Sequence, residues 1–288
     1  MGSFNLAGWT DPVTVTHPEG LTKEHIENFP GFQTWISTLK NSLKQQKYTS
    51  HPLHDDDYKL RSIDIQANFM VGPAENQRPL FLYLVATIEN IRGEKLPYAV
   101  FLRGGSVAVL IILRPSDSLD ERYVVMTEQP RISAGSLSFM EIPAGMLDPN
   151  DRKFAGAAAR ELQEEIGLVL KEKDLTNMTE IALKGQQTEE MLQLAMYPSP
   201  GGCDEFISIF LWEREMDRMQ IDGLRGRLTG NRSEKEKITV RLLNYEKLLQ
   251  VGARDGKTLA AWALYEYLKR TMQIDHNGKE VVVTTNEP

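Results

Sequence analysis

Three glutamates near residue 165 occupy positions that ordinary helix chemistry does not favour. Glu161, Glu164 and Glu165 lie three and four residues apart, so a helix would gather their carboxylates on one face. They would also occupy the last turns before Gly167, where the helix dipole disfavours negative charge. A solvated acidic face is the simpler interpretation, but it leaves this placement unexplained. A bound divalent cation would remove both the repulsion and the conflict with the dipole, so the pattern favours a metal site.

The other residue types in this part of the chain favour a hard cation. Carboxylates without neighbouring Cys or His side chains prefer Mg²⁺, or Mn²⁺, to zinc. The five histidines lie at or before residue 54 or at residue 276, and Cys203 is the one cysteine. This distribution excludes a Cys-rich zinc site, and it excludes Ser-His or Cys-His catalysis built within residues 55–275. Chemistry there must use carboxylates, lysines, hydroxyls or a bound metal.

The elements that must position these residues follow from hydrophobic periodicity. A helix is predicted over residues 154–166, ended by Gly167, and a buried strand over the apolar run 107–113. Further strands are predicted at residues 60–71, 80–89, 123–126, 139–142, 192–196, 205–212 and 238–243, and further helices at residues 32–46 and 258–272. Helices interrupt the strands irregularly, which favours an α+β fold with a mixed-sheet sandwich over a doubly wound parallel sheet.

Length and charge bound the organisation and the class of protein. The 288 residues suit a small N-terminal domain at 1–95, a larger domain at 96–275 and a loose tail at 276–288. The net charge of -7 argues against nucleic-acid binding, which usually needs a basic face. The apolar run 107–113 is far shorter than the roughly 20 residues that span a bilayer. No secretory signal and no membrane partner are therefore expected.

The sequence around the three glutamates resembles the Nudix box. Residues 160–168 read Arg-Glu-Leu-Gln-Glu-Glu-Ile-Gly-Leu and fit its second half, which is Arg-Glu, an aliphatic residue, any residue, Glu-Glu, any residue, Gly and an aliphatic residue. The first half departs from the pattern, because Asp151 replaces the first glutamate and lies one residue too far from Arg160. Blocks at 127–131, 141–146 and 199–205 are similar to the ADP-ribose and ADP-sugar pyrophosphatase branch of the Nudix hydrolases, in particular to its plant plastid members.

This resemblance implies a fold, an activity and a set of site residues. The fold would be a Nudix fold, a mixed β-sheet sandwiched between helices, preceded by a small α+β N-terminal domain. The activity would be Mg²⁺-dependent hydrolysis of the diphosphate bond of ADP-glucose or ADP-ribose to AMP and a sugar phosphate. The implied metal ligands are Glu161, Glu165 and the carbonyl of Ala144, with Glu164 close by. The implied substrate-binding residues are Arg103, Arg131, Glu141 and Glu205. Glu234 matches the loop glutamate that serves as general base in the family, and Glu236 is the second candidate.

The same resemblance suggests a homodimer, with the N-terminal domain contributing to dimerisation, and a location in the plastid stroma, with the cytoplasm as the alternative. Packing of the N-terminal elements on their own chain is an equally good interpretation of that domain.

Other activities remain open. The departure at Asp151 leaves room for a Nudix domain that binds ADP-ribose or a nucleotide sugar as a sensor without turnover, and a UDP-sugar diphosphatase is a further alternative. A NADH pyrophosphatase fits less well, because one cysteine is too few for the zinc ribbon that is common there, and the acidic balance disfavours an mRNA-decapping role.

Overall fold

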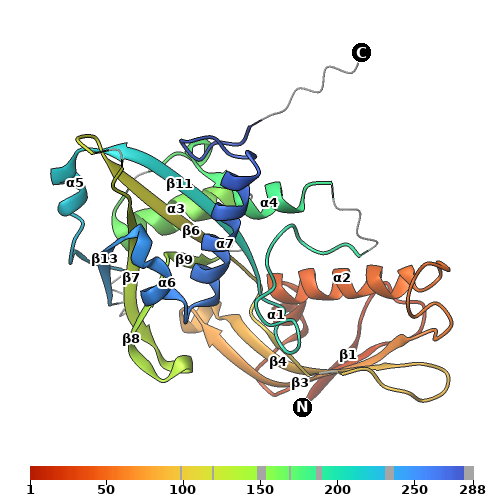
Figure 1. The fold of residues 1–288 in the computed structure, drawn as a ribbon. Coiled ribbons are helices and arrows are strands. Elements are labelled where there is room, and N and C mark those ends of the chain that lie inside the picture. The colour runs from red at the N-terminus through yellow and green to blue at the C-terminus, as the bar shows by residue number, and fades with distance from the viewer. Residues whose placement is uncertain are drawn as a thin grey trace. The chain divides into compact units, whose positions relative to one another are not determined.

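The computed structural model describes residues 1–97, 99–118, 120–147, 154–168, 170–185, 190–230 and 237–281. The side chain of Glu161 lies outside this description. The described residues form two compact units (Figure 1). The first contains residues 1–105 with two later segments, 190–193 and 199–206, and the second contains the rest of the described chain.

The first unit is a sheet with helices. Its strand order is β1-β2-β3-β4-β5, with β2 and β3 parallel and the other neighbouring pairs antiparallel. Helix α2 begins at Pro30, whose fixed φ and missing N–H suit a first helical turn. Its apolar side chains at 32, 35, 36, 39 and 43 contact the apolar cluster of the sheet. The elements are β1 (Gly2–Asn5), β2 (Thr14–His17), α1 (Lys23–Glu27), α2 (Pro30–Gln45), β3 (Lys59–Val71), β4 (Arg78–Glu89) and β5 (Ala99–Leu102).

The second unit is built on a larger sheet, which has eight strands among the described residues. Its main path is β10-β11-β6-β7-β13-β12, with β8 paired to β7 and β9 paired to β6. The strands are β6 (Gly105–Pro115), β7 (Tyr123–Arg131), β8 (Ser136–Glu141), β9 (Ala144–Met146), β10 (Thr176–Asn177), β11 (Phe206–Met216), β12 (Leu228–Thr229) and β13 (Ile238–Asn244). The helices are α3 (Phe154–Ile166), α4 (Met178–Leu183), α5 (Arg218–Asp222), α6 (Leu248–Gly252) and α7 (Gly256–Arg270).

Strand β6 is buried on both faces, which explains its nearly continuous apolar sequence. Side chains alternate along a strand, and the even-numbered residues 108–112 share an apolar cluster with Tyr265 and Leu268 of α7. The odd-numbered residues 107–113 share a second cluster with Leu162 and Ile166 of α3. Helices therefore cover both faces of the sheet (Figure 1). The prediction of an α+β fold with a sheet sandwiched between helices is confirmed.

Strands β6 and β7 pair at one end only, and beyond it each pairs with a different short strand. Strand β7 pairs with β6 over residues 123–125, but its residues 127–131 pair with β8. The opposite end of β6, residues 106–108, pairs with β9. Ile142 and Pro143 connect β8 to β9, and the Pro143 carbonyl accepts a hydrogen bond of 2.9 Å from the N–H of Val109. The end of β8 and the start of β9 are thereby held beside β6.

One region differs from the sequence-based expectation. Residues 192–196 do not form a strand; a bridge joins Met196 to Ile207, while Leu192 and Leu194 are half exposed. The alternating apolar residues there indicate a strand only if one face is buried, and these leucines keep about half of their surface exposed. Of the tail expected at 276–288, residues 282–288 lie outside the described residues, and among the described ones Glu280 forms a bridge with the buried Ile274. No helix in the described ranges is long and apolar enough to cross a bilayer.

Candidate active site

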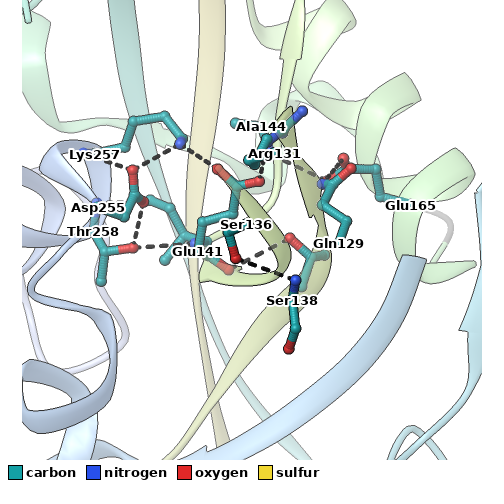
Figure 2. Close-up of polar contacts among 12 residues, drawn as sticks. Gln129, Arg131, Ser136, Ser138, Glu141, Ala144, Glu165, Asp255, Lys257 and Thr258 are labelled. Carbon is teal, nitrogen blue, oxygen red and sulfur yellow. Dashed lines mark hydrogen bonds and ion pairs between the residues drawn. The ribbon is translucent and has the colours of Figure 1, made fainter. Parts of the chain in front are cut away.

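Glu165 is a buried carboxylate near the end of α3, with 6% of the residue exposed. Its Oε1 accepts a hydrogen bond of 3.3 Å from the side-chain amide of Gln129, and its Oε2 accepts one of 3.1 Å from the N–H of Ala144 (Figure 2). The hydroxyl of Thr229 donates to its main-chain carbonyl. Contacts from three strands therefore fix both the carboxylate and the backbone of this residue.

The other two glutamates of the acidic face are Glu164 and Glu161. Glu164 is exposed, and the backbone of Glu161 lies in α3 one turn before Glu165. Within the described residues no group of three His, Cys, Asp or Glu side chains is close enough to hold a metal. The described donors, the Glu165 carboxylate and the neighbouring Ala144 main chain, are hard oxygen ligands of the type that Mg²⁺ and Mn²⁺ prefer. In donor chemistry this part of the site fits such a cation.

Helix α3 ends in a geometry that requires glycine. Gly167 has a φ of +70°, and its N–H donates to the Gln163 carbonyl while the N–H of Leu168 donates to the Leu162 carbonyl. The bond from Gly167 joins C′ to C3, which is the bond of the αL motif that ends a helix with a left-handed residue. The guanidinium of Arg227 lies against Gly167, where a Cβ would come within 3.1 Å of it. The motif and this arginine together fix the last turn of α3, which carries Glu165.

We expect Gly167→Ala to lower the free energy of unfolding by about 1–2 kcal/mol, because an L-residue is strained in the left-handed region. The new methyl group would also displace Arg227. Urea denaturation followed by circular dichroism measures the effect. The matched control is Gly201→Ala, whose Cβ would meet no atom within 4 Å and which should change the same free energy by no more than about 0.5 kcal/mol. Equal effects of the two substitutions would contradict the role assigned to Gly167.

Glu141, at the end of β8, carries a second buried carboxylate, and 2% of the residue is exposed. Its Oε1 accepts from Nε of Arg131 at 2.6 Å, and its Oε2 accepts from Nζ of Lys257 at 2.7 Å (Figure 2). Lys257 also contacts Oδ1 of Asp255 at 2.8 Å. Burial lowers the pKa of Lys257, but the attraction of Glu141 and Asp255 outweighs it and raises the pKa above its usual value. Lys257 is therefore charged at neutral pH.

Arg103 and Glu205, the other expected substrate-binding residues, lie in the first unit. The guanidinium of Arg103 is 3.4 Å from the Glu205 carboxylate, and the guanidinium carbon lies 6.0 Å from the centre of the Phe81 ring. The carboxylate of Asp204 accepts hydrogen bonds from the main-chain N–H groups of Arg103 and Gly104. Burial raises the pKa of Asp204, although these N–H groups oppose the shift. The structure thus pairs Arg103 with Glu205, and it joins Arg131 to Glu141 and Ala144 to Glu165 within the second unit.

The two candidate general bases, Glu234 and Glu236, lie outside the described residues. The segment that contains them begins after Thr229, which pairs with Ile238 across β12 and β13. Thr229, five residues before Glu234 in the sequence, donates to the main chain of Glu165.

Several residues of the site were not predicted from the sequence, namely Gln129, Thr229, Asp255, Lys257 and Thr258. One signal would have found Lys257. It lies in the first turn of α7, after the N-cap Asp255, where the helix dipole disfavours a cation. A lysine at the start of α7 conflicts with the helix dipole just as carboxylates at the end of α3 do. Gln129 lies within a sequence block used for the resemblance, but its type alone does not indicate that it contacts Glu165.

Comparisons with known proteins bear on this arrangement. A model of the NUDIX domain matches residues 103–263. A relative named "Nudix hydrolase 14, chloroplastic", from Arabidopsis thaliana, is 38% identical over 264 residues, which cover 90% of this chain and 78% of the relative. A solved structure described as "Crystal structure of ADP compounds hydrolase" matches with a TM-score of 0.41 and 18% identity, over 74% of this chain and 97% of that one. The family match covers more than half of the chain and includes α3, with the Arg-Glu…Glu-Glu…Gly segment at residues 160–167. The chain belongs to the Nudix hydrolase family.

Proposed function

We propose that this Nudix hydrolase cleaves the diphosphate bond of ADP-sugars, with ADP-glucose and ADP-ribose as substrates and AMP and a sugar phosphate as products. The observation that carries the proposal is the buried carboxylate of Glu165, held by Gln129 and by the N–H of Ala144. The same end of the sheet presents Arg131, a permanent cation that suits diphosphate oxygens. An anion-binding arginine near a fixed metal-ligand carboxylate is an arrangement suited to diphosphate hydrolysis.

Glu161, Glu164, Glu165 and the carbonyl of Ala144 would hold Mg²⁺ or Mn²⁺. When bound, such an ion neutralises charge on the diphosphate and lowers the pKa of a water. The protein's own part is to fix its ligands: the Ala144 N–H orients the Glu165 carboxylate, and the paired strands β6 and β9 hold Ala144 in place.

The substrate contacts would come from four residues in two pairs. Arg131 would bind phosphate oxygens, and Glu141, which accepts from its Nε, would orient it. Arg103 and Glu205, paired with each other in the first unit, would contact the nucleotide sugar. The guanidinium of Arg103, whose carbon lies 6.0 Å from the centre of the Phe81 ring, is a planar, permanently charged group that suits phosphate oxygens.

The general base would be Glu234, with Glu236 as the second candidate. A base must come within hydrogen-bond reach of the attacking water. Glu234 is five residues from Thr229, which contacts Glu165, and five extended residues span at most about 18 Å. The attachment point at Thr229 therefore supports a base drawn from this segment.

The experiment that tests the substrate class is a panel of nucleotide sugars ranked by kcat/KM in the presence of Mg²⁺. We expect ADP-glucose and ADP-ribose to exceed UDP-glucose by about tenfold or more, since a pocket that hydrogen-bonds one base leaves polar groups unpaired with another. A preference for UDP-glucose would instead support a UDP-sugar diphosphatase.

A second candidate function is ligand sensing without turnover. The replacement of the first box glutamate by Asp151 favours this alternative, whereas the intact segment at residues 160–168 favours catalysis. Calorimetry that shows tight ADP-ribose binding, with no product formed from any member of the panel, would support the sensor.

Location and assembly follow as further parts of the proposal. The Arabidopsis relative is named as chloroplastic, which supports a plastid location that imaging of a fluorescent fusion in plant cells tests. A homodimer formed through the N-terminal unit is proposed from the family resemblance, and light scattering at several protein concentrations tests it.

A further inference from the structure

Lys257 is a partly buried cation at an unfavourable end of a helix. It lies in the first turn of α7, and 16% of its side chain is exposed. The N-cap residue Asp255 offsets the conflict with the helix dipole, because its carboxylate accepts from the main-chain N–H groups of Lys257 and Thr258 and also contacts Nζ of Lys257. The helix start is thus arranged to hold this ammonium group in one place.

Two cations contact the Glu141 carboxylate, one at each oxygen. Lys257 contacts Oε2 at 2.7 Å and Arg131 contacts Oε1 through Nε at 2.6 Å (Figure 2). Arginine and a carboxylate otherwise prefer a bidentate pair that uses both oxygens and two guanidinium nitrogens. With Oε2 occupied by Lys257, Arg131 binds Glu141 at one oxygen, and 42% of the arginine side chain stays exposed.

The start of α7 also holds the connection between β8 and β9. The N–H of Ile142 donates to the Thr258 hydroxyl at 3.1 Å, and that hydroxyl donates to Asp255 at 2.7 Å. The next residues along this connection lead to Ala144, whose N–H contacts Glu165. The start of α7 therefore supports both the pair of Arg131 with Glu141 and the backbone that contacts α3.

We propose that Lys257 is a positioning residue for substrate binding: by occupying one oxygen of Glu141, it keeps the Arg131 guanidinium available to an anionic diphosphate. In this role Lys257 acts through Glu141 and needs no contact with the substrate. Without it, Glu141 offers both oxygens to Arg131, which closes the bidentate pair and neutralises the charge that attracts the diphosphate. This inference rests on the proposed function, in which Arg131 binds the diphosphate.

The test is steady-state kinetics of Lys257→Met and Lys257→Arg with ADP-glucose, or with the best substrate of the panel. We expect Lys257→Met to raise KM by about tenfold, the lower end of the range for residues that orient a ligand's direct contacts, with kcat within about twofold. An effect on KM alone indicates lost ground-state binding. Lys257→Arg keeps a cation on Glu141 and should restore KM to within about twofold of the parent.

Lys269→Met is the matched control at the other end of the same helix. Lys269 contacts a buried carboxylate, Glu213, at 3.1 Å and is exposed to a similar extent. Twelve helical residues place it about 18 Å along the axis from Lys257. Both Met variants break a buried ion pair and should lower Tm, but only Lys257→Met should raise KM.

The outcomes separate the inference from the function on which it rests. An inactive parent protein would overturn the proposed function. An active parent whose KM changes equally in Lys257→Met and Lys269→Met, or not at all in Lys257→Met, would overturn the positioning role alone. If Lys257→Met fails to fold, the comparison of Lys257→Arg with the parent decides: a KM within about twofold at unchanged Tm supports the role of the cation, and a rise above tenfold contradicts it.

Discussion

Glu165→Gln is expected to reduce kcat/KM for ADP-glucose by about a thousandfold, equivalent to about 4 kcal/mol of lost transition-state stabilisation. The substitution keeps the shape of the side chain but removes its charge, which is the property a divalent cation requires. One position of the new amide also becomes a donor, facing the donor groups of Gln129 and Ala144 that the carboxylate satisfies in the parent. Steady-state rates with saturating Mg²⁺ measure the loss.

The control for this substitution is Glu172→Gln, which removes an exposed carboxylate from the same unit. Its kcat/KM should stay within about twofold of the parent, as expected for a surface substitution away from the site. Circular dichroism and Tm should show that Glu165→Gln remains folded. Near-parental activity in a folded Glu165→Gln protein would rule out Glu165 as a metal ligand.

Glu234→Gln should lower kcat by about a hundredfold or more, the size expected for loss of a general base. Glu236→Gln serves as its neighbouring comparison and should have the smaller effect. The pH profile of kcat adds an independent criterion, because a base must be ionised to act. Removal of the base should abolish the fall in kcat on the acid side, which Glu236→Gln should retain.

If Glu236→Gln produces the larger loss of kcat and the flattened pH profile, Glu236 is the general base in place of Glu234. Loss of less than about tenfold in both single variants and in the double variant would place the base outside this segment.

The parts of the fold that depend on periodic sequence were predicted well. Helix α3 has the predicted bounds, Phe154–Ile166, because an amphipathic pattern ends at a glycine in the left-handed region. Strand β6 extends slightly beyond the predicted apolar run, since both of its faces are buried by helices. These signals are local: they depend on neighbouring residues and need no knowledge of distant contacts.

The remaining features depend on contacts between residues distant in the sequence. Lys257 joins Glu141 across 116 residues, and Gln129 joins Glu165 across 36, so no short pattern could pair them. The sequence predicted which carboxylates could do chemistry, and it did not predict what orients them. The strand predicted at residues 192–196 does not form for a similar reason. Burial against distant residues decides whether alternating apolar residues become a strand.

Phosphorus NMR of ADP-glucose incubated with the protein tests the central claim most directly. With Mg²⁺ present, the diphosphate resonances should disappear and be replaced by those of AMP and glucose 1-phosphate in equal amounts. Excess EDTA should stop the reaction, and renewed Mg²⁺ should restart it. Persistence of the diphosphate resonances with Mg²⁺ present, or the appearance of ADP in place of AMP, would contradict diphosphate hydrolysis at this site.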